Sequence, residues 1–318
     1  MNGKRLDAVD GLRAIAVLAV VVHHAGLNTF GLGTRGVDLF FVISGFCLSL
    51  PALTRMHAGE PFRFDIARFA RGRIKRIAPP YYAALGLFGI LSLTSFGVPT
   101  VASPPGQFEW IQDAAFLTSM APSYNASFWT LGVEARWYLI FPVVLALYAR
   151  SKLGFAAVAL GAYALYAWQN ALVDAGTLPC FMLGIVAADV FARGHAKSYL
   201  FVVAAVAAIA LAILSGHSDD PGNPAWHVAS FLVVVAGIGA LSRVTALRPL
   251  AFFGVASYSI YLVHQPIMYW LASFGWPLAL CAVCSVVAGL AFWRAIEVPA
   301  QAWRVRAPER ATSAVTSL

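Results

Sequence analysis

Charged residues are scarce in this chain of 318 residues: Asp, Glu, Lys and Arg together make up 11% of it, whereas 60% is hydrophobic. Soluble domains carry about 25% charged residues, so this deficit excludes an ordinary soluble domain and indicates a polytopic membrane protein. The formal net charge is +8, but the basic residues gather in short segments between apolar runs. Such a distribution is an orientation signal, and it argues against a nucleic-acid-binding protein.

Several familiar catalytic motifs are also missing. The sequence has no Gly-rich phosphate loop, no His-Glu-x-x-His motif and no Gly-x-Ser-x-Gly elbow, so a serine hydrolase or a zinc enzyme has no support and no metal is expected. The four cysteines all lie in apolar segments. We interpret Cys281 and Cys284 as a small buried pair rather than a redox or metal site.

Hydropathy predicts an all-α, polytopic integral membrane protein with about ten transmembrane helices. The predicted spans are 11–29, 36–53, 79–97, 128–149, 153–170, 178–193, 198–215, 226–243, 250–271 and 277–297. Lys and Arg concentrate in alternate loops, and Arg35 is the one basic residue in the outer set, so both termini are expected in the cytoplasm. Because Arg13 interrupts the first apolar run, we expect an uncleaved first helix rather than a signal peptide. We expect one membrane domain over 1–300 and a short basic cytoplasmic tail over 301–318.

The first span contains the most informative pair of residues. His24 follows Arg13 by eleven residues, which on a helix turns the chain by three turns plus roughly 20°. Both side chains therefore share one face, about 16 Å apart along the axis, and His24 is expected near the middle of the bilayer. Ionisable groups inside a membrane are costly, so they are functional candidates by default. An imidazole there is suited to act as a general base.

The first inner loop is rich in arginine. Arg73 and Arg76, three apart, share a face if the segment is helical, and Arg71 lies close in sequence. Two interpretations stay open on spacing alone. The segment is an interfacial helix against anionic lipid, or its guanidinium groups hold a phosphorylated ligand.

Four further polar residues lie within or at the edge of apolar spans. Asp38 begins the second span, Glu134 and Tyr138 share a face of the fourth, and His264 lies in the ninth, two residues before Pro266. For each of the three ionisable residues, participation in a site competes with a structural role. For Asp38 taken alone, a helix cap or a helix pairing is favoured. For Glu134, a structural role and participation in a site are equally favoured. For His264 taken alone, an interior histidine with its hydrogen bonds satisfied is favoured. Ser44 and Gly45 in the second span permit close helix approach.

Taken in order, these segments resemble the acyltransferase-3 family of integral membrane proteins. The matching segments are Arg13 with His24, the run 36–46, Arg73 to Pro79, the run 128–134 with Tyr138, and the run 258–266. Each motif alone is weak, whereas the ordered set is specific and spans most of the chain. The stretch Ala135-Arg136-Trp137 departs from the family, which often has a more acidic, Gln-containing run there.

The resemblance implies O-acylation of a carbohydrate hydroxyl with a cytoplasmic acyl-CoA as donor substrate. Acetyl-CoA is the first candidate for this donor. It implies a bacterial cytoplasmic (inner) membrane location and partners from glycan biosynthesis. His24 is then expected as general base, with Arg13 at the CoA or thioester end and Glu134 orienting His24 or the acceptor.

The other site residues follow from the same resemblance. Arg71, Arg73 and Arg76 are expected to bind the donor, and Asp38, Tyr138 and His264 the acceptor. Some members carry an extra hydrolase-like domain outside the membrane. We expect this protein to act without one, so that outer loops or a separate protein recognise the acceptor.

A transporter is the alternative function, because intramembrane His, Arg and Glu also form proton or substrate relays. Transporters often show inverted repeats or paired broken spans in both halves. We find no such pairing in this sequence, which favours the enzyme.

Overall fold

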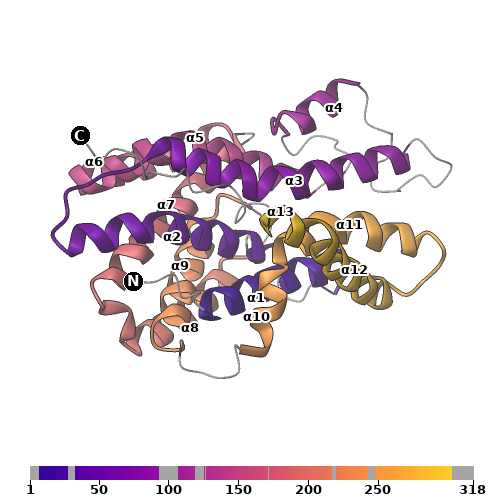
Figure 1. Ribbon diagram of the computed structural model, residues 1–318. Helices are drawn as coiled ribbons and strands as arrows, with labels where there is room; N and C mark the ends of the chain where they lie inside the picture. Colours follow the sequence, from indigo (N-terminus) through magenta and orange to yellow (C-terminus); the bar gives the residue numbers. More distant parts are fainter. Residues whose placement is uncertain are drawn as a thin grey trace, which may run out of the picture.

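The computed structural model describes residues 7–27, 33–92, 107–118, 125, 127–170, 172–216, 220–242 and 248–302. Within these ranges every regular element is a helix (Figure 1), which confirms the all-α prediction. The basic tail predicted over 301–318 lies outside the described residues from 303 onwards. The helices are α1(Asp7–His24), α2(Arg35–His57), α3(Ile66–Ser92), α4(Gln107–Ala114), α5(Phe128–Arg150), α6(Lys152–Trp168), α7(Val173–Ala192), η1(His195–Lys197), α8(Leu200–Leu214), α9(Pro224–Ile238), α10(Arg248–Val255), α11(Ser257–Ala272), α12(Leu278–Phe292), η3(Trp293–Glu297) and α13(Val298–Ala302).

Within the described ranges, four stretches of helix are long and apolar enough to cross a membrane: α2, α5, α7 and the continuous stretch Leu278–Ala302. Helices α6, α8 and α9 are apolar but shorter, at 17, 15 and 15 residues. Each of the ten predicted spans overlaps a helix. The protein is therefore helical where its sequence is most apolar, as a chain in lipid must be to satisfy its backbone groups.

Three boundaries differ from the prediction. Helix α3 begins at Ile66, so the basic segment and the third span form one helix that continues through Pro79 and Pro80. The ninth span is divided at Ala256 into α10 and α11, and the segment between the third and fourth predicted spans contains α4. Hydropathy marks where the chain is apolar, whereas helix ends depend on backbone hydrogen bonds, so the two need not coincide.

Helices α2 and α7 cross at two glycines. A Cβ atom added to Gly45 would lie 2.2 Å from the carbonyl oxygen of Phe181, and one added to Gly184 would lie 2.2 Å from the carbonyl oxygen of Val42. Small residues let helix backbones approach closely in membranes, where van der Waals packing replaces the hydrophobic driving force. The close approach predicted for Gly45 is confirmed.

Two apolar clusters flank the interior. One joins α2, α5, α7 and α9 and contains Phe41 and Trp137, whose rings meet edge to face with centroids 4.5 Å apart. Edge-to-face pairs of this kind contribute roughly 0.5–1.5 kcal/mol beyond their buried area. The other cluster joins α1, α3, α11 and α12 around Tyr81 and Ile260. Residues of both clusters line the cavity described below, which lies where the clusters meet.

Candidate active site

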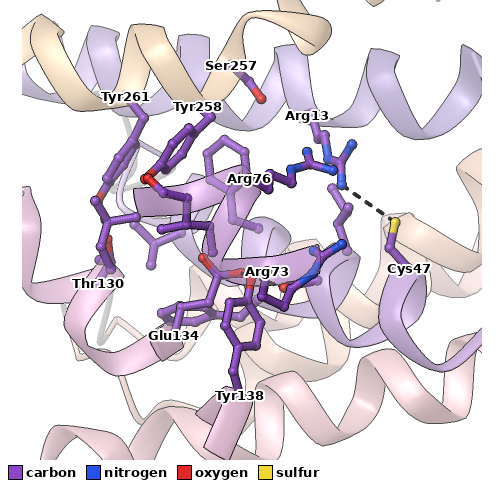
Figure 2. Close-up of a pocket in the computed structure, with 17 residues that line it drawn as sticks. Arg13, Cys47, Arg73, Arg76, Thr130, Glu134, Tyr138, Ser257, Tyr258 and Tyr261 are labelled. Atoms are coloured by element: carbon purple, nitrogen blue, oxygen red, sulfur yellow. Dashed lines mark hydrogen bonds between the residues drawn. The ribbon is translucent and has the colours of Figure 1, made fainter. Parts of the chain in front are cut away.

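A cavity of about 100 Å³ lies between α1, α2, α3, α5 and α11 (Figure 2). Three arginine side chains gather on one side of it in Figure 2, and Glu134, Tyr258 and Tyr261 lie on the other. Its polar lining consists of Arg13, Ser44, Cys47, Arg73, Arg76, Thr130, Glu134, Tyr138, Ser257, Tyr258 and Tyr261. Five of the nine predicted site residues (Arg13, Arg73, Arg76, Glu134 and Tyr138) are therefore brought together here.

The arginines of the cavity come from two helices. Arg13 on α1 lies 3.4 Å from Asp10 Oδ1 and donates to the sulfur of Cys47 at 3.6 Å. Arg73 on α3 lies against the ring of Tyr138, with its Cζ 6.0 Å from the ring centroid. Neighbouring cations repel one another, the more so away from water. An anion in the cavity would relieve that repulsion, and guanidinium groups pair in a fork with phosphate or carboxylate.

The exposed face of α3 carries the other basic side chains. Arg71 is exposed, and its Nε donates to the carbonyl oxygen of Ala67 on its own helix at 3.3 Å. Arg68 and Lys75 are exposed as well. The structure thus separates Arg71 from the cavity that Arg73 lines, because two residues along a helix rotate a side chain by about 200°. The basic side chains of α3 thus fall on two faces, one exposed and one lining the cavity.

Glu134 is held in place by two hydroxyl groups. Its Oε1 accepts a hydrogen bond of 2.5 Å from Tyr138, one turn further along α5, and another of 2.5 Å from Ser44 on α2. The i, i+4 relation of Glu134 and Tyr138 was predicted from the sequence; the bond from Ser44 was not.

His24 lies at the other end of α1 and pairs with His264. His24 Nδ1 and His264 Nε2 are 2.8 Å apart, and His264 Nδ1 lies 2.8 Å from the carbonyl oxygen of Tyr261. The ring of Tyr261 lines the cavity, and its centroid is 5.6 Å from that of His264. Tyr261 therefore stands between the arginine cavity and the histidine pair. His24 therefore contacts His264, whereas Glu134 bonds to Ser44 and Tyr138.

Asp38 occupies a different, buried network at the start of α2. Its Oδ2 accepts from Arg35 at 2.9 Å, and its Oδ1 lies 3.9 Å from Nε2 of His227. Donor atoms of Asp38, Cys180 and His227 lie within 4.8 Å of one another, as in a metal site. Each of the three groups already has a partner within the protein. Arg35 donates to the Asp38 carboxylate, and Cys180 donates to the Asp38 carbonyl at 3.4 Å. The two ring nitrogens of His227 contact the Tyr163 hydroxyl and a backbone carbonyl. This network joins α2 to α9, and Asp38 does not line the cavity described above.

Arg136, for which the sequence offered no role, fastens α5 to α7. Its Nε and Nη2 bond the two oxygens of Asp174 at 2.9 and 3.0 Å, and its Nη1 donates to the carbonyl oxygen of Phe116 at 3.0 Å. Paired bonds of this kind carry geometric specificity as well as energy.

Sequence reasoning missed Asn125. Its side chain donates at 2.6 Å to the carbonyl oxygen of Leu262, four residues before Pro266. A proline has no N–H for the carbonyl four residues earlier, so Asn125 supplies the donor that α11 lacks. A proline inside a predicted membrane helix is the signal that could have prompted a search for such a polar partner. Tyr258 and Tyr261 were also missed as cavity residues, although both lie in a segment that the sequence singled out.

The model of an acyltransferase domain family, acyltransferase-3, matches residues 6–296. The chain belongs to this family. It is similar to the peptidoglycan O-acetyltransferase OatA of Listeria monocytogenes, at 24% identity over 83% of this chain and 50% of that protein. It is likewise similar to the O-acetyltransferase OatA of Staphylococcus aureus, at 24% identity over 85% of this chain and 51% of that protein.

The chain spans about half the length of these relatives. No solved structure matches it. The family and the apolar helices together support a membrane location, and the matched family is one of acyltransferase domains.

Proposed function

We propose that this protein transfers an acetyl group from cytoplasmic acetyl-CoA to a hydroxyl group of a cell-envelope carbohydrate. The observation that carries the proposal is the arginine-lined cavity joined through Tyr261 to a histidine pair. In this proposal the domain over 1–300 forms ten spans in the bacterial cytoplasmic membrane, with both termini inside. The arginines then face the compartment that holds CoA, which agrees with the basic loops of that side.

Donor binding is assigned to the arginine side of the cavity. Arg73 and Arg76 hold phosphate groups of CoA, and Arg13 holds the part of the donor nearer the thioester. Arg13 and His24 are about 16 Å apart along α1, so the flexible pantetheine arm extends past Tyr261 toward His24. The exposed basic face of α3 rests on anionic lipid headgroups.

The chemical step needs one base, because the thioester is already activated. His24 takes the proton of the acceptor hydroxyl while the hydroxyl oxygen attacks the thioester carbonyl carbon. The C–S bond of the tetrahedral intermediate then breaks, an ester forms, and the proton leaves His24 for the departing thiolate. The products are an acetylated sugar and free CoA, so atoms and charges balance. Covalent transfer through His24 is the less favoured route.

The acceptor is expected to be a glycan exposed outside the membrane. Peptidoglycan is the first candidate, since the Listeria relative carries that name, and exopolysaccharide and O-antigen follow from the family. A separate protein of glycan biosynthesis presents the acceptor in this proposal.

Acetyl-CoA turnover by the purified protein in liposomes tests the proposal. With a muropeptide acceptor, the wild type is expected to release free thiol and form an acetyl ester detectable by mass spectrometry. His24→Ala should lose activity by a factor of about 10²–10⁴, the usual contribution of a general base. His195→Ala, a change at an exposed histidine of η1, is the control and should retain full activity.

Two outcomes would reject the proposal. Normal turnover by His24→Ala would remove His24 from the reaction. Uptake of a solute into the liposomes, with no release of thiol from acetyl-CoA for any of the acceptors named above, would favour the transporter.

A further inference from the structure

His24 belongs to a chain of three hydrogen-bonding groups that ends on the protein backbone. His24 Nδ1 lies 2.8 Å from His264 Nε2, and His264 Nδ1 lies 2.8 Å from the carbonyl oxygen of Tyr261. His264 is fully buried, at 0% exposed, whereas His24 is partly exposed. The chain thus runs from a partly exposed side chain to one that no solvent reaches.

The direction of these hydrogen bonds follows from the last acceptor. A carbonyl oxygen only accepts, so Nδ1 of His264 carries a hydrogen. A neutral imidazole carries one hydrogen, which leaves a lone pair on Nε2 of His264. That lone pair accepts from Nδ1–H of His24, and Nε2 of His24 is left with the lone pair that a general base requires.

The backbone around His264 is held so that this direction is maintained. Pro266 frees the carbonyl of Leu262, and Asn125 bonds to it at 2.6 Å. The hydroxyl of Tyr261 lies 2.7 Å from that of Thr130 on α5, and Ser127 bonds the side chain of the neighbouring Gln265 at 2.9 Å. Helix α11 is therefore tied to the start of α5 on both sides of His264.

We propose that His264 is a positioning residue that fixes His24 in the Nδ1–H tautomer and presents Nε2 to the acceptor hydroxyl. This role differs from acceptor binding and rests on the proposed function of His24. When His24 takes up the proton, its Nδ1–H still donates to His264, so the cation formed during the reaction keeps its partner. Removal of the partner leaves both tautomers of His24 accessible and its ring free to rotate.

Two substitutions at position 264 separate this role from a purely structural one. The side-chain oxygen of Gln reaches the position of Nε2, whereas that of Asn reaches only the position of Nδ1. His264→Gln can thus accept from His24, and His264→Asn cannot. We expect His264→Gln to keep kcat within about tenfold of the wild type, and His264→Asn to lose about 10²-fold, the loss seen when a supporting partner is removed. The KM for acetyl-CoA should be unchanged in both, since the donor site lies at the arginines.

Equal activity of the Gln and Asn variants, at matched amounts of folded protein, would overturn the proposal. A change in KM rather than kcat would overturn it as well, because it would place His264 in substrate binding.

A spectroscopic measurement tests the tautomer without any turnover. The protein has seven histidines. In ¹⁵N-histidine-labelled protein in bilayers, solid-state NMR identifies which ring nitrogen carries hydrogen, and His24→Ala identifies the His24 signals by their loss. The expected result is a protonated Nδ1 and a bare Nε2 for His24 in the wild type, and a mixture in His264→Asn. A bare Nδ1 and a protonated Nε2 for His24 in the wild type would reject the proposed positioning role of His264. This result stands even if the protein releases no thiol, an outcome that would reject the proposed function alone.

Discussion

Glu134 accepts hydrogen bonds from Tyr138 and Ser44 through the same carboxylate oxygen, each at 2.5 Å. Among the described residues it is the only carboxylate that lines the cavity, in which three arginines also lie. Its charge therefore offsets the repulsion of the arginines, while its oxygen links α5 to α2. The two roles can be separated experimentally.

Glu134→Gln should lower the thermal stability of the empty protein. A Gln oxygen still accepts from both hydroxyl groups, but the charge that offsets the arginines is gone. We expect a fall in Tm of roughly 2–4 °C, about that of a 1 kcal/mol loss in a domain of 150–250 residues. CoA should then raise the Tm of the variant by more than that of the wild type, because the ligand replaces the missing negative charge. Equal Tm values and equal CoA shifts would contradict this account of Glu134.

Arg73→Ala and Arg76→Ala should each raise the KM for acetyl-CoA by about tenfold or more, since each removes a charge-assisted bond worth roughly 1.5–3 kcal/mol. Arg71→Ala and Arg68→Ala are matched controls from the exposed face of the same helix. They should leave KM within about twofold and reduce binding to anionic vesicles instead. A KM effect as large in Arg71→Ala as in Arg73→Ala would place the donor on the outer face of α3.

Gly45→Ala should destabilise the packing of α2 against α7. The added Cβ would lie 2.2 Å from a backbone oxygen of α7, so one helix must move. Overpacking of this kind costs about 1–3 kcal/mol and occasionally more. Gly86→Ala is the matched control, because a Cβ at that helical position meets nothing within 4 Å. It should stabilise the protein by up to about 1 kcal/mol, the helix preference of Ala over Gly. The yield of monodisperse protein and its Tm in detergent distinguish the two, and similar values for both would refute the close crossing.

The sequence was sufficient where function depends on local periodicity or ordered motifs. Arg73 and Arg76 share the face that lines the cavity, as their spacing predicted, and Gly45 lies at a helix crossing. The pairing of His24 with His264 lay beyond such reasoning, because 240 residues separate them and their contact depends on how α1 packs against α11.

The expectations for Asp38 and Arg71 show where motif reasoning ends. Asp38 lies in a matching motif, yet Arg35, three residues earlier, turns its carboxylate into a buried ion pair. Arg71 lies beside Arg73 in the chain but on another face of the helix. Membership of a motif does not tell which side chains line the cavity, because that depends on how the side chains pack.

Asn125 and Pro266 should be energetically coupled. Asn125→Ala leaves the Leu262 carbonyl without the donor that replaces the missing proline N–H, an uncompensated buried group that costs about 1–3 kcal/mol. In a Pro266→Ala background the restored N–H can bond that carbonyl within the helix, so Asn125→Ala should cost less there. A double-mutant cycle on Tm or on unfolding in detergent measures the difference. Other contacts of Asn125, including its bond from the Ser127 N–H, are lost in both backgrounds and cancel. The expected coupling is about 1 kcal/mol; strictly additive effects would mean that Asn125 does not serve the carbonyl that Pro266 exposes.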